Sequence, residues 1–320
     1  MNIGTDISGA KNVEQALRLA GLDWTVDKNP TFYSKDDPDG MIFKKSKKFV
    51  SISRPDIGEE FAHVTDKYQV VQNSQAFAFL DVLKNEGAEF WRAGEFRHGR
   101  KCYVIMNFGS PLTLSTGDTI VRSIIVSTSH DATSGIRANW LPVRIVCSNV
   151  IGAVLREAPV VFRHSQRLEN GIEYDDVEEM LFRGDRYFDH LKESAEYMLR
   201  RSFTEDDLDQ LIAQVFDSVQ ATGSDSRRAR VNVDYLYDRI HESFTRGMGT
   251  DGRNRYDAYN AVCEYLDHYR PIGNSFTTNG DNVEGQLRPI VQERHFNSVL
   301  STNRFGGIKL RTKTLELLMN

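Results

Sequence analysis

Residues 120–157 hold the feature that most limits the fold, two apolar strand-like runs separated by a polar turn and followed at once by a helix-like run. The segment is IVRSIIVSTSHDATSGIRANWLPVRIVCSNVIGAVLRE. Residues 120–128 and 136–147 predict antiparallel strands, because residues 130–135 between them are rich in turn-forming types. Ser148 or Asn149 is placed to cap a helix over residues 148–157. We therefore expect an antiparallel strand pair with this helix packed on one face of the sheet.

A second strand pair precedes this segment. Residues 89–108 alternate apolar and polar positions around a turn in which Gly99 supplies backbone freedom, which predicts a hairpin. Together the two pairs predict an α+β fold, an antiparallel β-meander with packed helices and a helical C-terminal part. Apolar residues at helical spacing occur over residues 13–22 and 74–84, and in several stretches after residue 175. We expect an N-terminal helix and extended arm over residues 1–40, an α+β core with the sheet over 41–170, and a mainly helical region over 171–320.

Composition excludes several classes of protein. A chain of 320 residues that is 40% hydrophobic and 27% charged is typical of a folded protein with a sizeable core. No run approaches the roughly 18 to 20 uncharged apolar residues of a membrane helix, and the N-terminus lacks the pattern of a signal peptide. We therefore expect a cytoplasmic protein that does not enter a membrane. The wide spacing of the 3 cysteines predicts reduced thiols and no structural zinc site.

Two residues of the central segment are candidates for catalysis. His130 has the chemistry of a general base that Asp131 would orient, and Cys147 that of a nucleophile at a capped helix start. In the structural alternative, Asp131 forms an Asx-turn with its own backbone, His130 closes the sheet edge and Cys147 is a buried core residue. The nucleotide-binding motifs GxGxxG and GxxxxGK[ST] are absent, as are HExxH and paired-cysteine metal motifs. We expect a protein that is not an enzyme and uses no cofactor or metal.

Positive charge is concentrated in the predicted sheet, although the chain is acidic overall. Residues 41–150 hold 14 Lys/Arg against 10 Asp/Glu, a net charge of +4. The remainder of the chain holds 26 Lys/Arg against 35 Asp/Glu, a net charge of −9, so the whole chain carries −5. A basic sheet face with aromatic residues is typical of proteins that bind single-stranded DNA, but arginines also keep the open side of a sheet soluble. The candidate DNA-binding residues are Arg92, Arg97, Arg100, Lys101, Arg122, Arg137, Arg144, Trp91, Trp140 and His130.

The stretch SHDATSGIRANWLPVRIVCSNVIGAVLREA, followed by FRHSQRLE, resembles the core of the phage/plasmid-like protein family, catalogued as domain of unknown function 932. The stretches AGLDWTVDKNP, YQVVQNSQAF and YNAVCEYLDHYRP extend the resemblance over residues 15–310. The resemblance implies a phage or plasmid context and no particular chemistry, because no activity is established for the family. A weaker architectural likeness is to phage single-strand annealing recombinases of the RecT, Redβ and Erf kind, since a meander followed at once by a helix is similar to their core.

These observations favour a phage- or plasmid-associated protein that binds single-stranded DNA for annealing or recombination without a cofactor. A homo-oligomer is implied by the likeness to annealing recombinases alone. The alternative is an acidic interaction protein that modulates a host or defence factor, since a net charge of −5 suits a surface that mimics nucleic acid or engages a basic partner. An enzyme that uses Cys147 or His130 is the third possibility.

Overall fold

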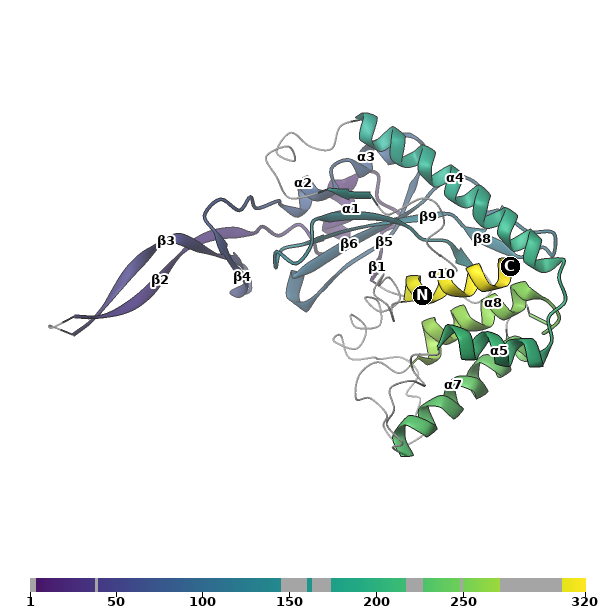
Figure 1. Ribbon diagram of the computed structural model, residues 1–320. Helices are drawn as coiled ribbons and strands as arrows, with labels where there is room; N and C mark the ends of the chain where they lie inside the picture. The colour runs from purple at the N-terminus through teal and green to yellow at the C-terminus, as the bar shows by residue number, and fades with distance from the viewer. Residues whose placement is uncertain are drawn as a thin grey trace.

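An antiparallel sheet with the strand order β1-β5-β6-β9-β10-β12, the central sheet, forms the middle of the molecule (Figure 1). The computed structural model describes residues 4–37, 40–144, 160–162, 174–216, 227–247, 250–270 and 307–320. The strands are β1 (Thr5–Asp6), β5 (Glu89–Phe96), β6 (Lys101–Asn107), β9 (Ser123–Ser129), β10 (Ile136–Trp140) and β12 (Val160–Phe162). Antiparallel pairing of β5 with β6, β6 with β9 and β9 with β10 confirms the predicted α+β meander.

The second predicted strand pair is present, but its strands are shorter than expected. The run that begins at Ile120 divides, and its first part becomes β8 (Thr119–Val121), which pairs with β7 (Leu112–Thr113) and β11 (Val143–Arg144) in a separate small sheet. The run that begins at Ile136 leaves the central sheet after Trp140, where Pro142 has no N–H to offer a ladder. Cys147 and the helix predicted over residues 148–157 lie outside the described residues.

The two faces of the central sheet contribute to different apolar clusters. Val104 and Met106 of β6 belong to the main core, with α1 (Val13–Leu19), α2 (Asn73–Phe77), α3 (Leu80–Asn85) and α4 (Tyr174–Leu199). Because side chains alternate along a strand, Tyr103 and Ile105 point to the opposite face and join a smaller cluster with Leu141.

The segment predicted as one helix over residues 74–84 is divided into two helices, α2 and α3.

The described C-terminal part is helical, as predicted. It contains α5 (Glu205–Val215), α7 (Arg227–Arg246), α8 (Arg255–Glu264) with the π-helical turn η3 (Tyr265–Tyr269), and α10 (Gly307–Met319). Thr204 caps α5, because its hydroxyl accepts the N–H of Asp207 at 3.2 Å while its own N–H donates to the Asp207 carboxylate at 3.0 Å. A buried ion pair between Arg311 and Asp267 joins α10 to η3. Within the described ranges, no helix is long and apolar enough to cross a membrane.

A long two-stranded hairpin, the ribbon, projects away from the central sheet (Figure 1). It consists of β2 (Asp27–Asp37) and β3 (Gly40–Arg54), and β4 (Glu59–Thr65) pairs with the part of β3 nearest the core. The expected extended arm is therefore one strand of a hairpin, whose pairing joins residues on both sides of the predicted boundary at residue 40. The register shifts beside Thr31, where the Ser46 hydroxyl accepts the N–H of Phe49 at 3.0 Å and shapes a bulge.

Candidate nucleic-acid interface

Arg144 is buried, which corrects its assignment as a DNA-binding residue. Its side chain is 1% exposed and forms an ion pair with Asp118, while its guanidinium carbon lies 5.7 Å from the ring centre of Tyr256 on α8. The Tyr256 hydroxyl donates to the Asp118 carboxylate at 3.0 Å, and burial holds the pKa of Tyr256 far above its usual value. Arg144 therefore joins the small sheet to α8 and offers no charge to a phosphate.

Trp140 is likewise a core residue and not an exposed stacking surface. Its side chain is 9% exposed, and its ring packs edge-on against Phe108 with 6.0 Å between ring centres. It also lies directly against Gly184 of α4, where an added methyl group would come within 2.9 Å of the indole. The assignment of Trp140 to a DNA-stacking role is therefore corrected, because both faces of the strand are covered where it ends.

His130 is also buried, which corrects its inclusion in a DNA-binding surface. Its Nε2 lies 2.8 Å from Oδ1 of Asn73, and its ring centre lies 5.2 Å from that of Trp24. The carboxylate of Asp131 instead accepts the N–H of Thr133 at 3.1 Å, which confirms the predicted Asx-turn. His130 and Asp131 thus shape the end of β9, and the imidazole of His130 fills the space between the central sheet and the base of the ribbon.

Arg100 and Arg122 are half-buried in ion pairs that connect parts of the fold. Arg100 contacts Glu59 at 3.0 Å and donates to the carbonyl oxygen of Phe61 at 2.7 Å, so it joins the central sheet to β4. Arg122 contacts Asp185 of α4 at 3.2 Å. Both side chains are engaged, which weakens the expectation that they contact DNA.

The remaining predicted sheet residues are more accessible. The register places Arg92, Lys101 and Arg137 on the face of the central sheet that carries the smaller apolar cluster. Arg137 is exposed, whereas Arg92 donates to the carbonyl oxygen of Gly4 at 3.1 Å. Arg97 is exposed in the β5–β6 turn. Trp91, which is also among these more accessible residues, packs partly against the smaller apolar cluster. The structure therefore brings together only part of the predicted surface.

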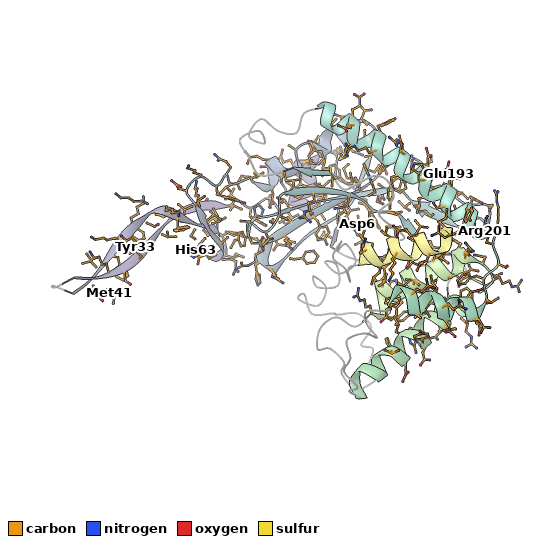
Figure 2. The ribbon with its side chains drawn as sticks, in the orientation of Figure 1. Asp6, Tyr33, Met41, His63, Glu193 and Arg201 are labelled. Atoms are coloured by element: carbon orange, nitrogen blue, oxygen red, sulfur yellow. The ribbon has the colours of Figure 1, made fainter. Side chains whose placement is uncertain are left out.

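The ribbon carries an exposed set of aromatic and basic side chains that sequence reasoning missed. Most of the exposed large apolar residues in the described chain belong to it: Phe32, Tyr33, Met41, Phe43 and Phe49. Figure 2 shows Tyr33 on the ribbon. Tyr33 lies opposite Lys44 and two residues from Lys35, so these three side chains share one face of the hairpin. The signal in the sequence is the run KKSKK between two aromatic residues, Phe43 and Phe49.

A buried arginine fixes the base of the ribbon. Arg54, the last residue of β3, contacts Asp56 at 2.9 Å and Glu95 of β5 at 2.8 Å, and its guanidinium lies 4.2 Å from the ring centre of Trp24. The indole N–H of Trp24 donates to the same Glu95 carboxylate at 3.0 Å. The hydrogen bond from Arg54 holds the pKa of Asp56 below its usual range. The ribbon is thus attached to the central sheet by a network of charged hydrogen bonds.

The turn between β5 and β6 completes this attachment. Gly99 has a φ of +99° and lies so close to Trp24 that a side-chain carbon would come within 2.5 Å of the indole, which confirms its predicted role in the turn. Arg97 and His98 adopt left-handed φ values of 50° and 57°. This conformation directs the carbonyl oxygen of His98 toward Arg54, which donates to it at 3.2 Å. The strained turn is therefore part of the ribbon's base.

The thiol of Cys102 lies near this base but is closed to solvent. Burial raises the pKa of Cys102 well above its usual value, so the group stays a neutral thiol. The described residues hold no group of three or more His, Cys, Asp or Glu side chains arranged to bind a metal ion. The ribbon thus presents exposed lysines and aromatic rings, and its base is fixed to the central sheet.

Comparison with known proteins identifies a family and no function. A model of the family described as "Domain of unknown function (DUF932)" matches residues 60–300, a narrower span than the resemblance suggests and one that begins after β3. No curated protein and no solved structure matches the chain. The match covers most of the residues from β4 onward, including the whole meander of the central sheet. The chain belongs to the DUF932 family.

Proposed function

We propose that this protein binds single-stranded DNA through the ribbon and acts, without a cofactor, in annealing or recombination of phage or plasmid DNA in the cytoplasm of a bacterial host. The observation that carries the proposal is the exposed ring of Tyr33 between Lys35 and Lys44 on one side of the ribbon. A base stacks on an exposed aromatic ring while lysines contact the phosphates on either side of it. We call these three residues the basic side of the ribbon.

The local charge favours this role despite the acidic total. Residues 40–50 include Lys44, Lys45, Lys47 and Lys48 and no carboxylate. Lysines also protect exposed strand edges from pairing with other chains, and that role alone requires no DNA. The exposed tyrosine distinguishes the two roles, because edge protection is served by charge and is weakened by an uncovered aromatic ring.

Fluorescence anisotropy with labelled oligothymidine tests the proposal. Contacts from Lys35 and Lys44 predict that affinity falls as salt rises, with a slope of log K against log salt of about −1.4 from these two lysines alone. We expect weaker binding to a duplex of the same sequence, because stacked bases offer no face to Tyr33. Absence of binding at about 50 mM salt, or binding that is insensitive to salt, would refute the proposal.

Variants separate the ribbon from the central sheet. We expect Lys35→Ala with Lys44→Ala to weaken binding and reduce the salt slope, and Tyr33→Ala to weaken binding while Tyr33→Phe retains most of it, because phenylalanine keeps a stacking ring. The matched control is Lys11→Ala with Lys192→Ala, which removes the same charge from exposed positions outside the ribbon.

A second double variant, Lys101→Ala with Arg137→Ala, removes two accessible cations of the central sheet. If it abolishes binding while the ribbon variants bind normally, DNA is held by the sheet and the ribbon proposal is wrong. Equal losses in the ribbon variants and in the control would likewise show that net charge, and not the ribbon, determines affinity.

A further inference from the structure

A pocket of about 450 Å³ lies beside the N-terminal helix α1. Its walls come from α1, from the segment 22–25 that leads into β2, and from the region of α2 and α3. The apolar residues that line it are Val13, Leu17, Leu22, Trp24 and Ala78. A concave pocket of this size with an apolar lining can hold a small organic molecule.

The charged residues of this pocket are mostly acidic. Glu14, Asp23 and Asp81 supply three carboxylates, and Arg18 supplies the one positive charge of the lining. Arg18 already forms an ion pair with Glu14 at 2.6 Å, so these two charges offset each other. The carboxylates of Asp23 and Asp81 remain, and they give the pocket a negative potential. A ligand that carries a positive charge is therefore favoured over a neutral or negative one.

Hydrogen bonds fix the walls of the pocket. Oδ1 of Asp81 accepts the N–H of Val13 at 2.7 Å, which joins α3 to the start of α1. The side-chain amide of Gln72 accepts the N–H of Val26 at 2.8 Å and donates to the carbonyl oxygen of Val26 at 2.8 Å. The indole of Trp24 is held by the network at the base of the ribbon. Because these walls are in place before a ligand enters, binding costs little conformational entropy.

We propose that this pocket binds a small organic cation, an amine attached to an apolar chain or ring. The ammonium group would bond to the carboxylates of Asp23 and Asp81, and the apolar part would leave water against Leu17 and Leu22. A metal ion suits the pocket less well, because calcium takes six to eight oxygen ligands and the described residues hold no group of three or more side chains arranged for a metal. The proposal does not rest on DNA binding.

Isothermal titration calorimetry of the full chain with phenethylamine and with phenethyl alcohol tests the proposal. The two probes have nearly the same shape, but only the amine is charged at neutral pH, as lysine is. We expect the amine to bind at least about tenfold more tightly than the alcohol, because only the amine donates charge-assisted hydrogen bonds. The affinity for the amine should also decrease as salt rises. No binding of the amine, or equal affinity for both probes, would overturn the proposal.

A double variant removes the charge of the pocket without changing its shape. Asp23→Asn with Asp81→Asn should weaken binding of the amine by about tenfold or more and leave binding of the alcohol unchanged. Asparagine at position 81 keeps a carbonyl oxygen for the N–H of Val13, so the wall is preserved. The matched control is Glu178→Gln with Glu316→Gln, which removes the same charge from exposed positions outside the pocket. Equal losses in the two double variants would show that net charge, and not this pocket, determines affinity.

A third variant tests where the amine binds. Ala78 lines the pocket and is exposed, so Ala78→Trp should fill the pocket while the melting temperature stays close to that of the unaltered chain. We expect this variant to lose binding of both probes. Binding of the amine that is as tight as in the unaltered chain would place its site elsewhere and overturn the proposal.

Discussion

Gly184 of α4 and Trp140 of β10 lie in direct contact, since a methyl group at Gly184 would come within 2.9 Å of the indole ring. Alanine ordinarily stabilises a helix relative to glycine by up to about 1 kcal/mol. We expect Gly184→Ala to destabilise the protein instead, by about 1–3 kcal/mol, because the methyl group overpacks the interface. Urea denaturation measures the change. Gly9→Ala, where an added carbon meets nothing within 4 Å, is the control, and a stabilised Gly184→Ala variant would contradict the contact.

Asp118 neutralises the buried charge of Arg144. Asp118→Ala should lower the free energy of unfolding by about 3–5 kcal/mol, because it leaves a guanidinium buried without its partner. The comparison is Glu14→Ala, which breaks the surface ion pair with Arg18 at a cost of less than about 1 kcal/mol. Similar losses in the two variants, measured by thermal denaturation, would show that Arg144 is accessible to solvent.

Burial raises the pKa of Asp257 from 3.8 to about 6, despite the lowering effect of the Arg253 N–H that donates to its carboxylate. The native state therefore holds a proton that the unfolded state releases between these two values. Stability from this group is fully present below pH 4, decreases as pH rises from about 4 to about 6, and is constant above that range. Asp257→Asn should remove this dependence. Melting temperatures of both proteins across this range provide the test, and parallel profiles would contradict it.

Arg54 attaches the ribbon to β5 and Trp24. We expect Arg54→Lys to increase hydrogen exchange in the half of β3 nearest the core, because lysine keeps the charge but not the planar set of donors that reaches both Asp56 and Glu95. Exchange in β6 should be unchanged. The control, Arg18→Lys, alters an exposed pair on α1. Unchanged protection in β3 would mean that strand pairing with β4 alone fixes the ribbon's base.

Local patterns predicted the central sheet well. The turn at Gly99, the polar segment 130–135 and the alternation in β5 and β6 each depend on neighbours in the sequence, so the hairpin and the β9–β10 pair are visible without tertiary information. The N-cap of α5 at Thr204 likewise depends on a residue nearby in the sequence, Asp207. Strand ends were less predictable, because β8 pairs with β7 and β11 rather than extending β9.

Burial of charged and aromatic residues was not predictable from the same patterns. Arg144 resembles a surface cation until Asp118 and Tyr256, distant in sequence, are known to enclose it. Trp140 lies in a strand whose apolar and polar side chains alternate as predicted, yet the burial of its indole depends on contact with α4. The ribbon was missed for the opposite reason. Aromatic residues such as Phe32 and Phe43 normally indicate a core, and the turn-forming residues within 27–40 favour an extended arm, so only the observed pairing shows them on an exposed hairpin.

The attachment of the ribbon has a mechanical consequence. Arg54 and Arg100 brace its base against the β5–β6 hairpin, and β4 stiffens the adjoining half of β3. We therefore expect a force applied near Met41 to bend the hairpin without rotating its base. Bending concentrates at the bulge beside Ser46, where the regular ladder is interrupted. We expect the outer part of the hairpin to move about this point while the central sheet remains fixed.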